Sequence, residues 1–294
     1  MHEYLNLKEQ GDFYAGHVAC PGCVEALALR VILNTVGADA VAVIPPSCSA
    51  VICGIYPNSS LKIPVYQTTL EASAASASGI KRALNARGKP DTTVIALAGD
   101  GGTHDIGFQA LSSAVERNED ILYFCFDNEG YMNTGSQKSS ATPIFASTGS
   151  TPAGKLSKKK NLTEIMAAHE IPYTANATPG HLDDLARKIE KAKKIRGTKV
   201  ITVLIPCLPG WGVAEDMGVT VARLAVETGM FPLYEVEEGY RYTLNHKTKD
   251  RPVTDYLSTQ KRYSHLSKEE IDLIQSYVDA EWKRLTKKAA SASD

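Results

Sequence analysis

The chain has 294 residues, which is enough to bury a substantial core as one large α/β domain or two smaller ones. Hydrophobic residues make up 43% of it, charged residues 22%, and the net charge is −1. This is the composition of a globular protein, and it gives no electrostatic support for nucleic-acid binding. No segment is long and apolar enough to span a bilayer, and the N-terminus lacks a signal-peptide pattern. We therefore expect a cytoplasmic protein whose six cysteines form no structural disulfides.

The N-terminal part of the chain is expected to begin with a polar lead-in over residues 1–15. A Cys-x-x-Cys sequence, Cys20-Pro-Gly-Cys23, follows in a Pro-Gly turn, and dense apolar residues directly after it predict a helix. The other elements expected before residue 90 are strands over residues 41–45 and 63–68 and a helix of small residues over 71–84.

The central stretch of the sequence predicts a strand, a glycine-rich turn, a helix and a second strand. An apolar run over residues 94–98 ends in Gly99-Asp100-Gly101-Gly102, and apolar residues then recur at helical spacing from 106 to 115. A second apolar run over residues 121–126 ends in Asp127-Asn128-Glu129-Gly130. This is the layout of a parallel βαβ unit. Asp100 and Asn128 should therefore lie at the carboxyl ends of neighbouring strands, where ligands of open α/β sheets bind.

The residue types in these two turns suit a Mg²⁺-diphosphate. Glycines let the backbone approach an anion closely, and the N–H groups that open the next helix favour negative charge. Asp100 and Asn128 offer hard oxygen ligands of the kind that Mg²⁺ prefers. Taken alone, the Gly-Asp-Gly-Gly sequence fits equally well an ordinary turn in which Asp100 caps the helix.

The second half of the chain continues the alternation of helices and strands. A polar loop over residues 136–154 follows the Asn128 turn, and a loop of this length indicates an active-site wall. The basic run from Lys155 to Lys160 is expected to be a solvated face, with binding to an acidic partner as the alternative. The remaining expected elements are helices over residues 162–169, 182–195, 219–228 and 268–285 and strands over 172–177 and 200–206.

These elements predict an α/β fold with a mostly parallel sheet and helices on both faces. Residues 1–235 are expected to form one domain that carries the cofactor and metal sites. Residues 234–251 are polar and aromatic without a clean period, and an amphipathic helix is predicted after them. Residues 236–294 are therefore expected to be a C-terminal extension that docks on partner subunits.

The six cysteines divide into two groups. Cys53 and Cys125 lie in apolar segments and are expected in the core. A tetrathiolate metal site is suggested by the four cysteines that lie in or beside turns, Cys20, Cys23, Cys48 and Cys207. Their spacing does not separate a zinc ion from an iron–sulfur cluster. A redox dithiol is the less favoured alternative, because two turn cysteines accompany the Cys-x-x-Cys pair.

The motifs resemble two families, one nested in the other. Gly99-Asp100-Gly101, about 26 further residues and then Asn128 resemble the thiamine diphosphate motif. In that family the Asp, the Asn and a backbone carbonyl two residues later bind Mg²⁺, which implies Asp100, Asn128 and Gly130. Collinear blocks from about residue 16 to 235 resemble the β subunit of the 2-oxoacid:ferredoxin oxidoreductases, such as pyruvate:ferredoxin oxidoreductase. These blocks are Gly16–Glu25, Gly99–Gly107, Asp127–Gly135, Ala141–Pro143, Ser150–Lys155, Ala167–Tyr173, Pro206-Cys207 with Gly210-Trp211, and Ala222–Gly229.

The resemblance implies a thiamine diphosphate-binding fold and a set of site residues. The four turn cysteines would hold the [4Fe–4S] cluster nearest the thiamine, and Asn133 and Glu25 would have catalytic roles, with Asn133 facing the substrate. Cofactor contacts are implied for Glu25, Cys48, Gly99, Asp100, Gly101, Gly102, Asn128, Gly130, Tyr131 and Asn133.

The implied reaction is oxidative decarboxylation of a 2-oxoacid, with electrons passing through the cluster to ferredoxin. In the resembling enzymes, the carboxylate that activates the thiamine aminopyrimidine comes from a separate pyrimidine-binding domain. The chain thus resembles half of an active site. Its expected partners are a pyrimidine-binding subunit, a ferredoxin-like subunit and ferredoxin, and the use of CoA is left open.

Two segments depart from the pattern of the pyruvate enzymes. Aromatic blocks in those enzymes correspond here to Pro57–Leu61 and Pro64–Ala72, which are smaller and more polar. Drift in a subunit contact and a change of substrate, for example to oxalate without CoA, are equally favoured explanations. Two other functions are weighed against this one. They are a non-redox thiamine diphosphate decarboxylase or synthase subunit with a structural zinc site, and a non-catalytic partner-binding subunit.

Overall fold

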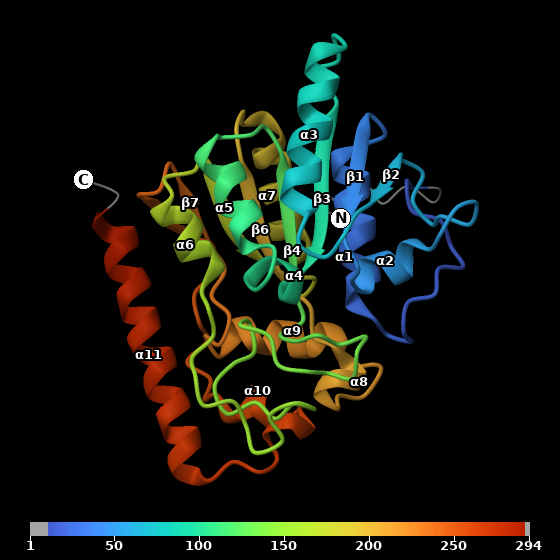
Figure 1. Ribbon diagram of the computed structural model, residues 1–294. Helices are drawn as coiled ribbons and strands as arrows, with labels where there is room; N and C mark the ends of the chain where they lie inside the picture. The colour runs from blue at the N-terminus through green and yellow to red at the C-terminus, as the bar shows by residue number, and fades with distance from the viewer. Residues whose placement is uncertain (1–10, 292–294) are drawn as a thin grey trace.

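Eight strands form one sheet in the part of the chain that the computed structural model describes, residues 11–291 (Figure 1). In spatial order they are β2 (Val65–Gln67), β1 (Ala40–Ile44), β3 (Thr93–Gly99), β4 (Leu122–Asp127), β6 (Lys199–Leu204), β5 (Tyr173–Ala177), β7 (Tyr234–Glu237) and β8 (Arg241–Leu244). The first six pair in parallel, and β7 and β8 extend one edge in antiparallel orientation. The predicted mostly parallel α/β fold is confirmed.

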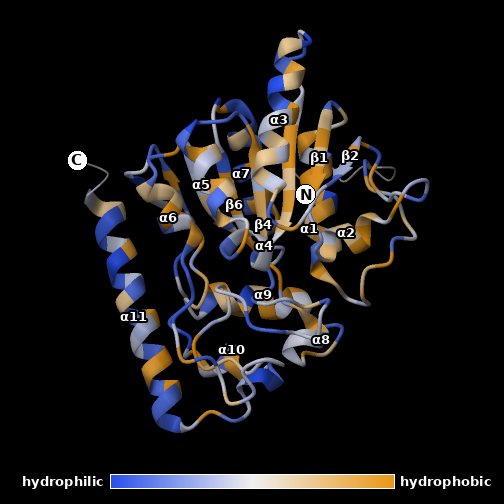
Figure 2. Ribbon diagram, viewed as in Figure 1, coloured by the Kyte–Doolittle hydropathy of each residue, from blue (hydrophilic) through white to orange (hydrophobic). Residues whose placement is uncertain are grey.

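Helices cover both faces of the sheet, which explains why its central strands are continuous apolar runs. One core lies under α1 (Val24–Val36) and α7 (Leu182–Lys194). The other lies under α3 (Ser73–Ala86), α5 (Phe108–Glu116) and α6 (Leu162–Ala168). Strands β3, β4 and β6 run between the two cores and form the hydrophobic centre of the molecule in Figure 2.

The order of the strands determines where a ligand can bind. β1 has β2 on one side and β3 on the other. The connections that leave β1 and β3 therefore diverge, and a crevice is left at the carboxyl ends of these strands. Two short helices, α2 (Cys48–Cys53) and α4 (Asp100–His104), begin at this crevice.

The helix predicted over residues 106–115 is observed as α5, which begins at Phe108. A separate short helix, α4, ends at His104, and Ile106 is exposed in the turn between the two helices. The chain turns here through Gly107, whose N–H donates to the Gly102 carbonyl at 2.8 Å. Residues 234–251, which show no clean period in the sequence, contain the β7–β8 hairpin. The domain boundary expected after residue 235 falls inside β7. Residues 1–10 of the expected lead-in lie outside the described residues.

The C-terminal helices form a layer beyond the carboxyl ends of the strands (Figure 1). They are α8 (Leu208–Trp211), α9 (Gly218–Glu227) and α10 (Thr254–Leu257), and they enclose a third core. The last helix, α11 (Lys268–Ser291), runs along the side of the molecule, where Arg284 and Lys288 bind Glu164 of α6. None of the helices found in residues 11–291 has the length and apolarity needed to cross a membrane.

The packing of α11 predicts that two of its leucines differ in their contribution to stability. Leu285 is buried against Tyr234 and Val236, whereas Leu273 is exposed. Leu285→Ala is expected to lower the free energy of unfolding by about 2–5 kcal/mol, because it removes buried methyl groups and leaves a cavity. Leu273→Ala is the control and should change it by less than about 0.5 kcal/mol. Urea unfolding compares the two, and equal effects would mean that α11 is not packed on the sheet edge.

Candidate active site

The carboxyl ends of β1, β3 and β4 enclose a cavity of about 580 Å³. This volume lies within the range of roughly 300–1,000 Å³ that is typical of cofactor and ligand sites. Both predicted turns reach the cavity, and segments that follow β1 and β2 complete its walls. The predicted site residues that line it are Cys48, Gly99, Asp100, Gly101, Gly102, Asn128, Gly130, Tyr131 and Asn133.

Three oxygen atoms converge in this cavity. Oδ1 of the Asn128 side chain lies 2.8 Å from the Gly130 carbonyl oxygen and 2.9 Å from Oδ1 of Asp100. At these distances the oxygen atoms repel one another, unless a cation lies between them or the amide turns over and donates two hydrogen bonds. A carboxylate, an amide and a carbonyl are the hard donors that Mg²⁺ prefers. The donor set therefore fits Mg²⁺. A bound Mg²⁺ would favour the amide orientation in which Asn128 Oδ1 faces Asp100 and Gly130. In this orientation Asn128 Nδ2 donates to Cys48 Sγ at 3.7 Å.

Hydrogen bonds fix the backbone carbonyl groups that precede Gly130. The donors are Ile205 N to Asp127 O at 2.9 Å, Trp211 Nε1 to Asn128 O at 2.8 Å and Thr142 Oγ1 to Glu129 O at 2.7 Å. The next carbonyl along the chain is that of Gly130, and it faces the Asn128 amide. The turn is thus built to direct the Gly130 oxygen into the cavity.

The environment of Asp100 also fits a cation. Asp100 is buried at the start of α4, and its Oδ2 accepts a hydrogen bond from Ser139 Oγ at 2.5 Å. Burial, and then the charge of Asp127, raises the pKa of Asp100 well above its ordinary value. A divalent cation beside such a carboxylate would keep it ionised at neutral pH.

Packing within the protein restricts two glycines of the Gly-Asp-Gly-Gly turn, Gly101 and Gly102. A Cβ on Gly101 would lie 2.3 Å from the ring of Tyr131, and one on Gly102 would lie 3.1 Å from Leu70. The Tyr131 hydroxyl is 3.1 Å from Gly101 O and 2.8 Å from Asp105 Oδ2, and it bonds to both acceptors. Tyr131 therefore packs directly against the turn. This packing is a second reason for glycine in the turn, in addition to the expected close approach of an anion.

A smaller cavity adjoins the first and is lined by the four turn cysteines. Their local structure is similar, because each lies at or near the start of a helix: Cys20 and Cys23 before α1, Cys48 in α2 and Cys207 before α8. Cys53 and Cys125 are buried in the core, as predicted, and do not line this cavity.

Three of the thiols in this cavity, those of Cys23, Cys48 and Cys207, are poor anions unless a metal binds them. Burial raises the pKa of Cys23 and of Cys207 to about 11, and it raises the pKa of Cys48 as well. Metal binding would deprotonate them. Within residues 11–291 no three His, Cys, Asp or Glu side chains converge on a single ion position. A [4Fe–4S] cluster has no such requirement, because each of its four cysteines binds a different iron atom.

The two cavities share the polar residues Cys48, Asn128 and Asn133. Cys48 Sγ donates to Asn133 Oδ1 at 3.6 Å. Glu25 lies on the cysteine side, where it is buried and its Oε1 accepts a hydrogen bond from Ser49 Oγ at 2.6 Å. Burial raises the pKa of Glu25 to about 7. The structure thus brings Glu25 to the cysteines and not to the lining of the larger cavity.

Ser139 and Trp211 are site residues that sequence analysis did not single out. Ser139 contacts Asp100 from 39 residues away in the chain, and Trp211 contacts Asn128 from 83 residues away. Both lie in segments already associated with the site, the loop over residues 136–154 and the block that ends at Trp211. No spacing rule connects them to their partners, so folding alone reveals these contacts.

The basic run from Lys155 to Lys160 is only in part the solvated face that the sequence predicts, because Lys158 is exposed whereas Lys155 is buried. Lys155 is buried and donates to Thr142 O at 2.6 Å. Lys159 forms ion pairs with Asp127 at 2.5 Å and with Glu129 at 2.8 Å. The acidic partner of Lys159 therefore belongs to the same chain.

The fold and the site together define a thiamine diphosphate-binding domain. Residues 48–203 match the family described as "Thiamine pyrophosphate enzyme, C-terminal TPP binding domain". The solved structure of 2-oxoglutarate:ferredoxin oxidoreductase from Magnetococcus marinus shares the fold. Its TM-score is 0.60 at 19% sequence identity, with 92% of this chain and 97% of that chain covered.

Comparison with curated relatives shows which kind of thiamine diphosphate-binding protein this chain is. The chain is 47% identical over 286 residues to pyruvate synthase subunit PorB of Methanocaldococcus jannaschii, with 93% of this chain and 96% of that protein covered. It is 43% identical over 297 residues to ketoisovalerate oxidoreductase subunit VorB of Pyrococcus abyssi, with 97% and 96% covered. The chain belongs to the β subunits of the 2-oxoacid:ferredoxin oxidoreductases, which are hetero-oligomeric enzymes.

Proposed function

We propose that this subunit holds thiamine diphosphate with Mg²⁺ in the larger cavity and a [4Fe–4S] cluster in the smaller one, and that the assembled enzyme oxidatively decarboxylates a 2-oxoacid. When bound, thiamine diphosphate supplies an electron sink for decarboxylation, and the cluster supplies one-electron transfer towards ferredoxin. The observation that carries this proposal is the shared wall of Cys48, Asn128 and Asn133, because it makes the two sites immediate neighbours.

The residues of this chain have separate roles in the proposal. Asp100, Asn128 and Gly130 hold Mg²⁺, and the backbone of the glycine-rich turn faces the diphosphate. Asn133 orients the substrate from the shared wall. Glu25 shapes the cysteine side of that wall, and the four turn cysteines hold the cluster.

Pyruvate is the first candidate substrate, because pyruvate synthase subunits are among the relatives. A branched 2-oxoacid is the second, because ketoisovalerate oxidoreductase subunits are also among them. Oxalate is the third, on the evidence of the polar segment Pro64–Ala72. Gln67, Thr68 and Leu70 of this segment line the larger cavity, and Gln67 is held there by a hydrogen bond to Gly54 O of 3.0 Å.

An exposed apolar surface beside the larger cavity is a suitable place for a partner subunit to bind. Val51 and Ile55 line the cavity with 49% and 71% of their surface exposed, and the neighbouring Tyr56 is 94% exposed. Such clusters commonly mark interaction sites. We propose that the pyrimidine-binding subunit covers this surface and supplies the activating carboxylate. Docking of residues 236–294 on a partner and the presence of a ferredoxin-like subunit remain predictions from the resemblance.

Substrate-dependent bleaching of the cluster absorbance tests the proposal. The enzyme is purified anaerobically with its partner subunits, and pyruvate, ketoisovalerate and oxalate are compared with and without CoA. We expect bleaching by pyruvate and fast turnover only when CoA is present. Bleaching by oxalate that does not depend on CoA would link the polar segment to substrate choice. A colourless protein that contains zinc would support the alternative, a non-redox decarboxylase or synthase subunit.

A further inference from the structure

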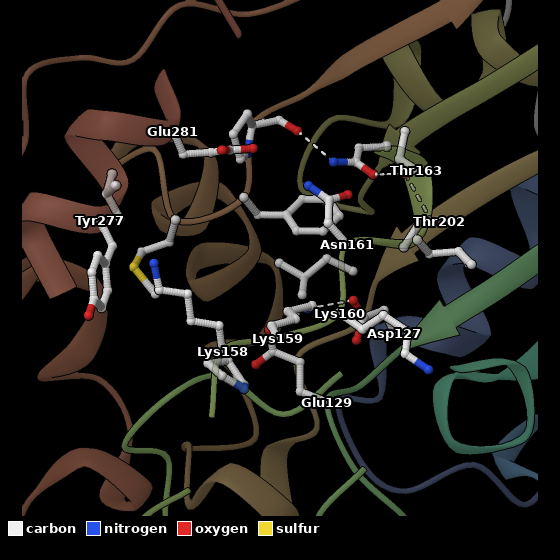
Figure 3. A pocket seen from close by; sticks show the side chains of 18 of the residues that line it. Asp127, Glu129, Lys158, Lys159, Lys160, Asn161, Thr163, Thr202, Tyr277 and Glu281 are labelled. Carbon is white, nitrogen blue, oxygen red and sulfur yellow. Dashed lines mark hydrogen bonds and ion pairs between the residues drawn. The ribbon is translucent and has the colours of Figure 1, made fainter. Parts of the chain in front are cut away.

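The Asn128 turn has a second face, which borders a separate cavity of about 310 Å³ between the sheet and α11 (Figure 3). Asp127 and Glu129 line this second cavity, whereas Asn128 between them lines the cofactor cavity. Lys159 Nζ lies 2.5 Å from Asp127 Oδ2 and 2.8 Å from Glu129 Oε1. One lysine thus binds both residues that flank the proposed Mg²⁺ ligand.

Glu129 has a backbone conformation that requires support. Its φ is +65°, in the left-handed region that residues other than glycine rarely adopt. Its Oε2 pairs with Arg262 at 2.6 Å, and the Arg262 guanidinium lies 3.7 Å over the ring of Trp211. Trp211 in turn donates to Asn128 O at 2.8 Å. Side-chain contacts therefore hold the strained residue that connects Asn128 to Gly130.

We infer that Lys159 is a positioning residue for the Mg²⁺ site. By fixing Asp127 and Glu129, it orients the oxygen atoms of Asn128 and Gly130 that are proposed to bind the metal. The inference rests on the proposed function, because it concerns the proposed Mg²⁺ ligands.

The two neighbouring lysines make different contacts, although all three border the second cavity. Lys158 Nζ lies 3.8 Å over the ring of Tyr277 in α11. Lys160 donates to the backbone carbonyl of His104. Lys158 therefore offers a matched comparison, since it places a charge in the same cavity as Lys159 without an ion pair to the turn.

Removing Lys159 has two opposing effects on Mg²⁺ binding. The Lys159 ammonium group repels Mg²⁺, so its loss would strengthen Mg²⁺ binding if long-range electrostatics dominated. Its loss also leaves Asp127 without this counter-ion in a buried position and weakens the support of Glu129. We expect the loss of ligand geometry to dominate and Mg²⁺ binding to weaken, because Mg²⁺ demands near-ideal octahedral coordination.

The test measures the Mg²⁺ concentration at which the assembled enzyme retains half of its thiamine diphosphate after gel filtration. Lys159→Met is expected to raise this concentration at least about 10-fold, as is typical when a residue that supports a metal ligand is lost. Lys159→Arg should stay within about 3-fold of the wild type, because it restores the charge and the donors. Lys158→Met should leave the value unchanged, and iron content should be unchanged in all three variants.

An unchanged or lowered Mg²⁺ requirement in Lys159→Met would overturn the inference. A wild-type enzyme that retains no thiamine diphosphate at any Mg²⁺ concentration would instead refute the proposed function. If Lys159→Met does not assemble, Lys159→Gln replaces it, since glutamine keeps a donor without the charge. A raised Mg²⁺ requirement supports the inference in either variant.

Discussion

Asp100→Ala is expected to weaken Mg²⁺-dependent binding of thiamine diphosphate by at least roughly 100-fold, or about 2.7 kcal/mol, while iron content stays unchanged. Asp100 is the one carboxylate among the three proposed ligands. Its removal therefore takes away the charge that balances the metal as well as one coordination bond. The measurement is thiamine diphosphate and iron per enzyme after gel filtration in buffer that contains Mg²⁺.

Asp91→Ala is the control for this variant. Asp91 precedes β3, at the opposite end of the strand from Asp100, and 82% of its side chain is exposed. Both cofactor and iron should be retained in the control. Loss of iron together with thiamine diphosphate in Asp100→Ala would show that Asp100 supports the fold and is not a dedicated metal ligand.

Cys48→Ala is expected to remove most of the iron and the brown colour, because it deletes one of four proposed cluster ligands. Thiamine diphosphate binding should weaken as well, since Cys48 also lines the larger cavity. Iron and sulfide per enzyme are the measurements.

Cys125→Ala removes the same atom from a site outside the cysteine cavity. Cys125 is buried in β4, where its Sγ lies 3.7 Å from Nε2 of His104. This variant should retain its iron and lose only some stability. Iron loss from Cys125→Ala would overturn the assignment of the four cluster ligands.

The strands that carry the site were predictable because they are buried on both faces. β3 and β4 therefore consist of unbroken apolar runs, and the polar turns mark their ends. The β7–β8 hairpin was not predictable in this way. Exposure alternates along β8, and the buried Glu235 of β7 accepts a hydrogen bond from Tyr173 and pairs with Lys191. In the sequence, such a charged residue resembles a residue of an exposed loop, because the partner that neutralises it is far away in the chain.

The candidate site was predictable where its residues adjoin those strands. Asp100 and Asn128 directly follow β3 and β4, so the parallel pairing of these strands brings them together. The role inferred for Lys159 had no such signal, because its partner Glu129 is 30 residues away and a loop without regular structure connects them. Glu25 follows Cys23 at the start of α1, which explains why it lies with the cysteines.

Cys48 borders both cavities, and this limits how such an enzyme can evolve. A substitution at the shared wall would alter the proposed cofactor site and the proposed cluster site together, so a change that suits one site would disturb the other. The segment from Gln67 to Leu70 lines the larger cavity without lining the smaller one. A substitution in this segment would therefore change the larger cavity and leave the lining of the proposed cluster site unchanged.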